Sequence, residues 1–176
     1  LTPGFKKWFV APLLPYIPWV IPANIITIFS NLFVYIGFFI SLNYKTPAGH
    51  ILIAGCLFFY LVGDHLDGMQ AKRTQTGSAL GEFCDHYLDA FNNGVILFTA
   101  FIVFGIDNPL LIAVVLTASY LAHMIVFYEQ FKTGWLTFEK LGSLEAVLLI
   151  LILVGTSAFE PVYLLLTANI ISAYRL

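Results

Sequence analysis

Two consecutive stretches decide the fold of this chain: the apolar run ILIAGCLFFYLVG at residues 51–63 and the polar run DHLDGMQAKR at residues 64–73. The apolar run has 13 residues, which make about 20 Å of helix, whereas the hydrocarbon core of a bilayer is roughly 30 Å thick. A helix that crosses a membrane here must therefore continue through the polar run. This continuation places Asp64 and Asp67 at or below the membrane interface.

The composition of the whole chain is typical of a membrane domain. Of its 176 residues, 60% are hydrophobic and 10% are charged, and the mean hydropathy is +0.89, whereas a soluble domain has roughly 25% charged residues. Apolar runs recur along the entire sequence, so we expect one integral membrane domain over residues 1–176. The net charge of −2 and the scattered basic residues indicate no nucleic-acid-binding surface. Cys56 and Cys84 lie in apolar or helical stretches and are predicted to be packing residues.

The apolar runs predict an all-α integral membrane fold with six transmembrane helices. Their apolar cores lie at Ile25–Leu42, Ile51–Gly63, Gly94–Gly105, Leu110–Phe127, Ala146–Phe159 and Val162–Ala173. Ahead of them, residues 1–23 carry the lysines and aromatic side chains of an interfacial segment. If the spans alternate in direction, all the basic residues except Lys45 fall on one side. The positive-inside rule therefore places both termini and the polar run at the cytoplasmic side.

Acidic side chains gather on one face of each of the two helices that residues 74–80 connect. At 100° per residue, the second helix carries on one arc Asp64, Asp67, Gly68 and Ala71. The helical pattern of the third helix begins near Gly81, and its acidic arc carries Glu82, Asp85, His86, Asp89 and Asn93. Because the connection between the helices is short, we expect the two acidic faces to meet.

Carboxylates packed this closely at membrane depth repel one another and need a neutralising cation. Oxygen ligands without cysteine favour Mg²⁺, Mn²⁺ or Ca²⁺ over Zn²⁺, although His65 and His86 keep zinc open. Beside the carboxylates, the small residues Gly68 and Ala71 let a phosphorylated ligand approach the backbone. The following basic residues, at positions 72 and 73, offer positive charge for phosphate oxygens. The pattern predicts metal-dependent chemistry on a phosphate-bearing substrate at the cytoplasmic interface.

The spacing of these residues resembles the signature of the CDP-alcohol phosphotransferase family, D-x-x-D-G-x-x-A-R-x8-G-x-x-x-D-x-x-x-D. Residues 64–89 match every fixed position but one, since Lys72 stands where the family has arginine. Residues 22–27, PANIIT, also resemble the segment with which the family begins its first helix. The family's fold has six transmembrane helices with both termini cytoplasmic, in agreement with the hydropathy pattern.

The resemblance implies a site for two divalent ions, Mg²⁺ or Mn²⁺, with ligands from the signature. The implied ligands are Asp64, Asp67, Asp85 and Asp89. Asp89 is also the implied general base for the incoming hydroxyl group, with Glu82 and His86 as helpers in proton transfer; a purely structural role for His86 is equally open.

The resemblance also implies which residues bind the substrate. They are Asn24, Gly68, Ala71, Lys72, Arg73 and Gly81. Lysine at position 72 keeps the charge but loses the bidentate geometry of arginine, so the phosphate contact is expected from either Lys72 or Arg73. We assign no catalytic role to Asn92, Asn93 or His123.

Residues 70–74 and 80–86 resemble the choline/ethanolamine phosphotransferase branch of the family. The implied reaction passes phosphocholine or phosphoethanolamine from a CDP-alcohol to diacylglycerol and releases CMP, and the implied assembly is a homodimer. The alternative within the family is a CDP-diacylglycerol-dependent enzyme that acts on inositol, serine or glycerol phosphate. A cation transporter is a remote alternative, because the two acidic helices become purely apolar beyond the carboxylates.

Overall fold

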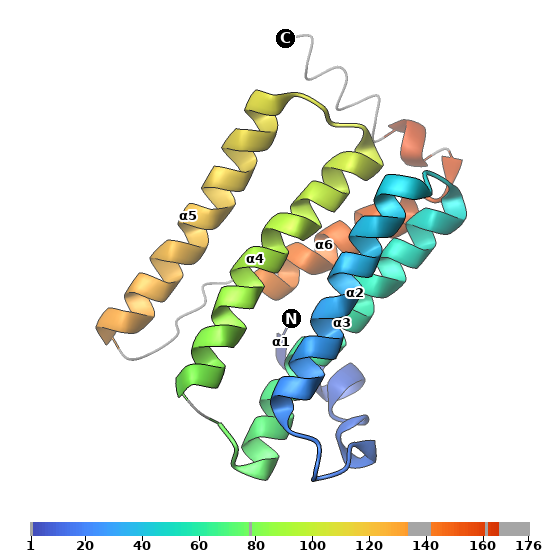
Figure 1. The fold of residues 1–176 in the computed structure, drawn as a ribbon. Coiled ribbons are helices and arrows are strands. Elements are labelled where there is room, and N and C mark those ends of the chain that lie inside the picture. The colour runs from blue at the N-terminus through green and yellow to red at the C-terminus, as the bar shows by residue number, and fades with distance from the viewer. Residues whose placement is uncertain (1, 78, 134–141, 161, 166–176) are drawn as a thin grey trace.

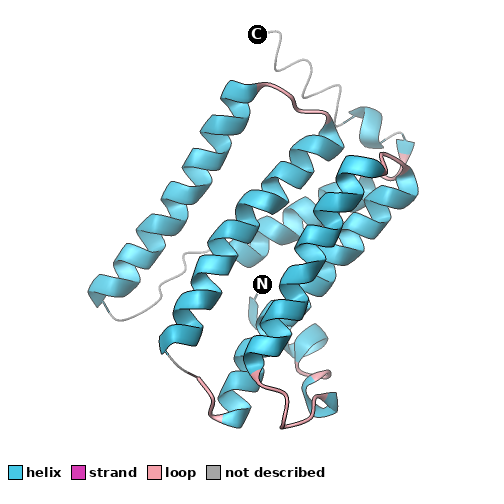
Figure 2. Ribbon diagram, viewed as in Figure 1, coloured by secondary structure: helices cyan, strands magenta, loops and turns pink. Residues whose placement is uncertain are grey.

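The computed structural model is a bundle of long helices preceded by a short, wound N-terminal segment (Figures 1 and 2). It describes residues 2–77, 79–133, 142–160 and 162–165, with the backbone alone for residues 79, 80 and 82–85. The described part contains helices and no strand, which confirms the all-α class. Its elements are α1 (Thr2–Phe5), the π-helical turn η1 (Lys6–Val10), the 3-10 turn η2 (Leu14–Tyr16), α2 (Ala23–Asn43), α3 (Pro47–Thr74), α4 (Ala79–Phe104), α5 (Pro109–Thr133) and α6 (Ser143–Thr156).

Helix α3 continues through the polar run, as its short apolar part predicts. It has 28 residues, which correspond to about 42 Å at the α-helical rise. It begins where the Thr46 side chain accepts a hydrogen bond from the Gly49 amide (3.1 Å), and Pro47 suits the first turn. It ends at Gln75, which adopts a left-handed conformation with φ of 56°. Helix α4 then begins at Ala79, close to the predicted start near Gly81.

Four of the described helices are long and apolar enough to cross a membrane: α2, α3, α4 and α5. Helix α6 coincides with the fifth predicted span, but it has 14 residues, which correspond to about 21 Å. Most of the sixth predicted span, Val162–Ala173, lies outside the described residues. The described part of the chain therefore contains four candidate membrane-spanning helices, and the count of six is not confirmed.

Helices α2 and α3 run side by side, α4 packs against α2, and α6 crosses behind them against α3 and α4 (Figure 1). The core between these helices is apolar, with Val34, Ile53, Leu57, Ile96 and Val154 almost fully buried. Helix α5 packs on the outer side of α4 and has no buried residue among those described. The packing of α2, α3 and α4 on one another therefore fixes the positions of the polar ends of α3 and α4.

Close packing of α2 on α3 depends on glycine at position 63. A Cβ atom there would overlap the Cβ of Ser30 and stand 3.4 Å from its Cα. Because these atoms belong to or adjoin the α2 backbone, they cannot rotate away. At Gly37, a Cβ would be 3.4 Å from the Cβ of half-buried Cys56, which agrees with the predicted packing role of this cysteine; the side chain of Cys84 lies outside the described part.

We expect Gly63→Ala to destabilise the bundle by about 1–3 kcal/mol, because the added methyl group forces α2 away from α3. The matched control is Gly55→Ala in the same helix, where a Cβ would meet no atom within 4 Å. The measurement is the midpoint of thermal unfolding in detergent micelles. Equal midpoints for the two variants would contradict this account of the α2–α3 contact.

Candidate active site

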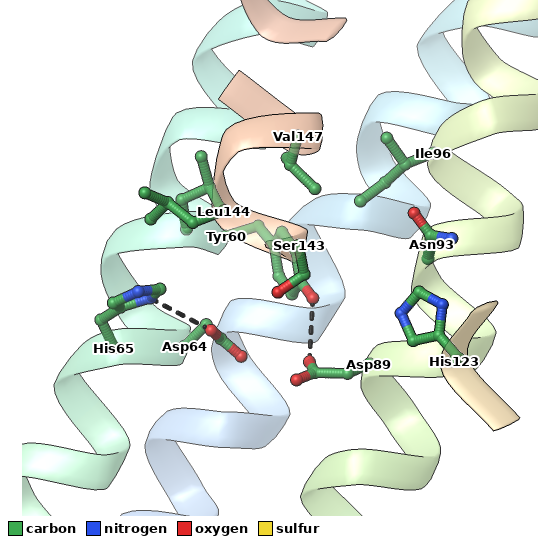
Figure 3. Close-up of a pocket in the computed structure, with 11 residues that line it drawn as sticks. Tyr60, Asp64, His65, Asp89, Asn93, Ile96, His123, Ser143, Leu144 and Val147 are labelled. Atoms are coloured by element: carbon green, nitrogen blue, oxygen red, sulfur yellow. Dashed lines mark hydrogen bonds and ion pairs between the residues drawn. The ribbon is translucent and has the colours of Figure 1, made fainter. Parts of the chain in front are cut away.

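A pocket lies where the polar parts of α3 and α4 meet the first turn of α6 (Figure 3). The lining residues are Tyr60, Leu61, Asp64, His65, Asp89, Asn93, Ile96, His123, Ser143, Leu144 and Val147. One carboxylate from each of the two signature helices, Asp64 of α3 and Asp89 of α4, therefore lines the same pocket.

The two α3 carboxylates lie in different surroundings. Asp64 is half-buried at the pocket, with its Oδ2 atom 3.2 Å from Nδ1 of His65. Asp67 is only 4% exposed, and its Oδ2 atom accepts a hydrogen bond from the Thr27 hydroxyl of α2 (2.6 Å). Beside Asp67, a Cβ at exposed Gly68 would meet no atom within 4 Å. The acidic face of α3 thus has open space next to its carboxylates.

On α4, Asp89 lines the pocket and accepts a hydrogen bond from the buried Tyr60 hydroxyl of α3 (3.0 Å). The side chains of Glu82 and Asp85, both predicted site residues, lie outside the described part of the chain. Gly81 is half-buried. Asp89 is the α4 carboxylate whose side chain belongs to the described part of the chain, and it lines the pocket.

His123 lines the pocket although it lies outside the signature, whereas His86, within residues 64–89, does not line it. The ring of His86 stacks on Phe127 of α5, with centroids 5.1 Å apart, and it is not among the pocket-lining residues. Nδ1 of His123 lies 3.0 Å from the Ser119 carbonyl, so this nitrogen carries the proton, because a carbonyl only accepts. No local pattern in the sequence marks His123, since its span is mostly apolar and His123 is brought to the pocket where α5 packs on α4.

Asparagine side chains connect the helices at and next to the pocket. The Asn31 amide of α2 donates to the Thr27 carbonyl (2.5 Å), and Asn92 of α4, which is fully buried, donates to the Asn31 side-chain oxygen. Asn93 donates to the Ser119 hydroxyl of α5. These residues bridge helices, and Thr27, which joins Asp67 to this network, is a site residue that the signature does not contain.

The end of α3 holds the N-terminal segment. The Arg73 guanidinium donates to the backbone carbonyls of Leu14 (2.6 Å) and Ile17 (2.5 Å) and lies 4.9 Å from the Trp19 ring centroid. Gln70, also fully buried, donates to the carbonyls of residues 18 and 21. Lys72, by contrast, is exposed. The structure thus directs Arg73 to the N-terminal backbone and leaves Lys72 at the surface.

The other predicted substrate-binding residues lie at the same end of the bundle. Asn24 is exposed in the first turn of α2, and Ala71 is half-buried on α3. Ala71 belongs to the end of α3 that Gln70 and Arg73 tie to the N-terminal segment, and Asn24 follows that segment at the start of α2. Neither Asn24 nor Ala71 lines the described pocket.

The donor atoms at the pocket fit a hard divalent cation by type. Asp64 and Asp89 supply carboxylate oxygens from two helices, and Mg²⁺ and Mn²⁺ prefer such ligands. Among the side chains that the structure describes, no three His, Cys, Asp or Glu residues form a metal-binding group. Asp85, the ligand that the signature adds, is outside that set.

Comparison with known proteins gives a match over most of the chain. Residues 20–174 match the profile of a family described as CDP-alcohol phosphatidyltransferase. An uncharacterized CDP-alcohol phosphatidyltransferase class-I family protein of Schizosaccharomyces pombe is 30% identical over 166 residues, 88% of this chain and 42% of the relative. Uncharacterized class-I family protein 1 of Dictyostelium discoideum is 28% identical over 151 residues, 81% of this chain and 38% of the relative. The chain thus spans about two fifths of the length of these relatives.

We expect Arg73→Gln to loosen the N-terminal segment, because it removes charge-assisted hydrogen bonds to two backbone carbonyls. Amide hydrogen exchange of residues 13–21 is expected to accelerate about tenfold or more. Lys72→Gln is the matched control, because the same change at an exposed neighbouring side chain leaves these hydrogen bonds intact. Equal exchange rates in the two variants would show that Arg73 does not hold this segment.

Proposed function

Because this chain belongs to the CDP-alcohol phosphatidyltransferase family, we propose that it transfers a phospho-alcohol from a CDP-alcohol to a hydroxyl acceptor and releases CMP. The observation that carries the proposal is the pocket shared by Asp64 and Asp89, the first and last carboxylates of the signature. Open space at neighbouring Gly68 supports a nucleotide approaching α3 there. The apolar helices and the family make the chain an integral membrane protein.

The proposed metal ligands are Asp64, Asp67, Asp85 and Asp89, which would hold two Mg²⁺ or Mn²⁺ ions. When bound, such ions neutralise the charge of the pyrophosphate and make its phosphorus more electrophilic. Hydrogen bonds from Thr27 to Asp67 and from Tyr60 to Asp89 orient two of these carboxylates. The chain's own contribution is therefore to keep the carboxylates in a defined geometry.

In the proposed reaction, Asp89 takes the proton of the acceptor hydroxyl. The hydroxyl oxygen then forms a bond to the phosphorus that carries the alcohol, and the bond from this phosphorus to the CMP oxygen breaks, so that CMP leaves with the electron pair. Exposed Lys72 is the proposed phosphate contact, because Arg73 binds backbone carbonyls. Roles of Glu82 and His86 in proton transfer stay predictions; the ring of His86 stacks on Phe127.

Phosphocholine or phosphoethanolamine is the proposed transferred group, with diacylglycerol as acceptor. This assignment is supported by residues 70–74 and 80–86, which resemble the choline/ethanolamine phosphotransferase branch. The proposed site faces the cytoplasm, on the positive-inside argument, and the proposed assembly is a homodimer. The alternative is an enzyme that uses CDP-diacylglycerol as the donor.

We expect the purified protein to release CMP from CDP-choline or CDP-ethanolamine when diacylglycerol and Mg²⁺ or Mn²⁺ are present. CMP release is expected to stop when EDTA removes the metal. The measurement is CMP release and lipid product by mass spectrometry. CDP-diacylglycerol with inositol, serine or glycerol phosphate, assayed in parallel, distinguishes the alternative. Absence of CMP with every donor and acceptor pair would refute the proposed function.

Removing single carboxylates should separate their roles. Asp89→Asn is expected to lower kcat about a hundred-fold or more, because a general base is lost, while CMP binding changes little. Asp64→Asn is expected to weaken metal-dependent binding of CMP, measured by isothermal titration calorimetry. Exposed Asp107, which follows α4 and is not a pocket residue, provides the matched control Asp107→Asn. Wild-type turnover in either signature variant would refute the role assigned to that residue.

A further inference from the structure

The Tyr60 hydroxyl group reaches across the pocket from α3 to Asp89 of α4. The Tyr60 side chain is only 5% exposed, and its hydroxyl donates to Oδ1 of Asp89 (3.0 Å; dashed line in Figure 3). It lies four residues before Asp64, so the two residues share a face of α3, and both line the pocket. We propose that Tyr60 is a positioning residue that holds the Asp89 carboxylate in its reactive orientation. This inference rests on the proposed function.

Packing alone does not explain a tyrosine at this position. Phenylalanine would fill almost the same volume, and the two preceding residues, Phe58 and Phe59, are phenylalanines. A buried hydroxyl costs free energy unless it forms a hydrogen bond. The extra oxygen of Tyr60 is therefore compensated by its hydrogen bond to Asp89, the residue that the proposed reaction uses.

A second hydrogen bond holds α4 close to Asp89. Asn92 follows Asp89 by three residues, about one helical turn, on α4. Asn92 is fully buried and donates to the Asn31 side chain of α2. The backbone that carries Asp89 is thus joined to α2 through Asn92, while its carboxylate is joined to α3 through Tyr60.

The consequence for Asp89 is a restricted orientation. An aspartate carboxylate can rotate about two side-chain bonds, and rotation displaces its oxygens by about 1 Å or more, enough to slow a reaction that depends on geometry. A hydrogen bond from a rigid phenol limits this rotation. Because the restriction acts on the group that takes the proton, its loss should affect turnover more than binding of the CDP-alcohol.

The test compares Tyr60→Phe with Tyr35→Phe, which removes a hydroxyl from a side chain on α2 that is 38% exposed and outside the pocket. Tyr60→Phe is expected to lower kcat about ten- to a hundred-fold, with the KM for the CDP-alcohol changed by about twofold or less. Tyr35→Phe should retain wild-type kcat. The stabilisation of each protein by CMP and Mg²⁺, measured by thermal unfolding, should stay at the wild-type value and shows that the variants fold and bind nucleotide.

A double-mutant cycle with Asp89→Glu tests whether Tyr60 acts through Asp89. Glutamate keeps the carboxylate but displaces it, so Tyr60→Phe should reduce the residual turnover of this variant by less than it reduces that of the wild type. Equal reductions would overturn the inference, as would wild-type kcat in Tyr60→Phe or a loss confined to KM or thermal stability. These results leave the proposed function intact, provided the wild type releases CMP; a wild type that releases none overturns both.

Discussion

The cost of placing carboxylates in an apolar helical bundle is the constraint on which the rest of this structure depends. A buried carboxylate needs hydrogen-bond donors or a cation, and α3 and α4 carry theirs at the ends of membrane-spanning segments. In this structure, hydroxyl groups of neighbouring helices donate hydrogen bonds to the carboxylates. Thr27 donates to Asp67 and Tyr60 donates to Asp89. Each of these bonds joins two helices, so satisfying the carboxylates also aligns α2, α3 and α4.

The same hydrogen bonds suit a site that binds a highly charged substrate. Carboxylates held by neutral donors keep their negative charge available for divalent ions, whereas basic partners would neutralise it. Arg73 follows the α3 carboxylates in sequence and is partly buried. It binds the carbonyls of Leu14 and Ile17. Its charge is thereby used to anchor the N-terminal segment, and the ionisable groups at the described pocket, apart from Tyr60, are Asp64, Asp89, His65 and His123.

Sequence periodicity predicted the features that depend on one helix at a time. The continuation of α3 through the polar run and the start of α4 near Gly81 were predicted correctly, because helix length and amphipathic faces are local properties. The meeting of Asp64 and Asp89 also followed from the short connection between these helices. Tyr60 and His123 were not predicted to be pocket residues, because each resembles an ordinary side chain of an apolar span until its neighbour on another helix is known.

The sequence by itself determined the class of the protein, the positions of its long helices and the residues that share each acidic face, since these follow from composition and from the 3.6-residue helical repeat. Tertiary structure alone decided which donor meets each carboxylate and whether Lys72 or Arg73 points away from the N-terminal segment. Those outcomes depend on the rotation and separation of neighbouring helices. For α2 and α3, contacts such as Gly63 against Ser30 set both the rotation and the separation. The residue pattern of a single helix carries no information on either quantity.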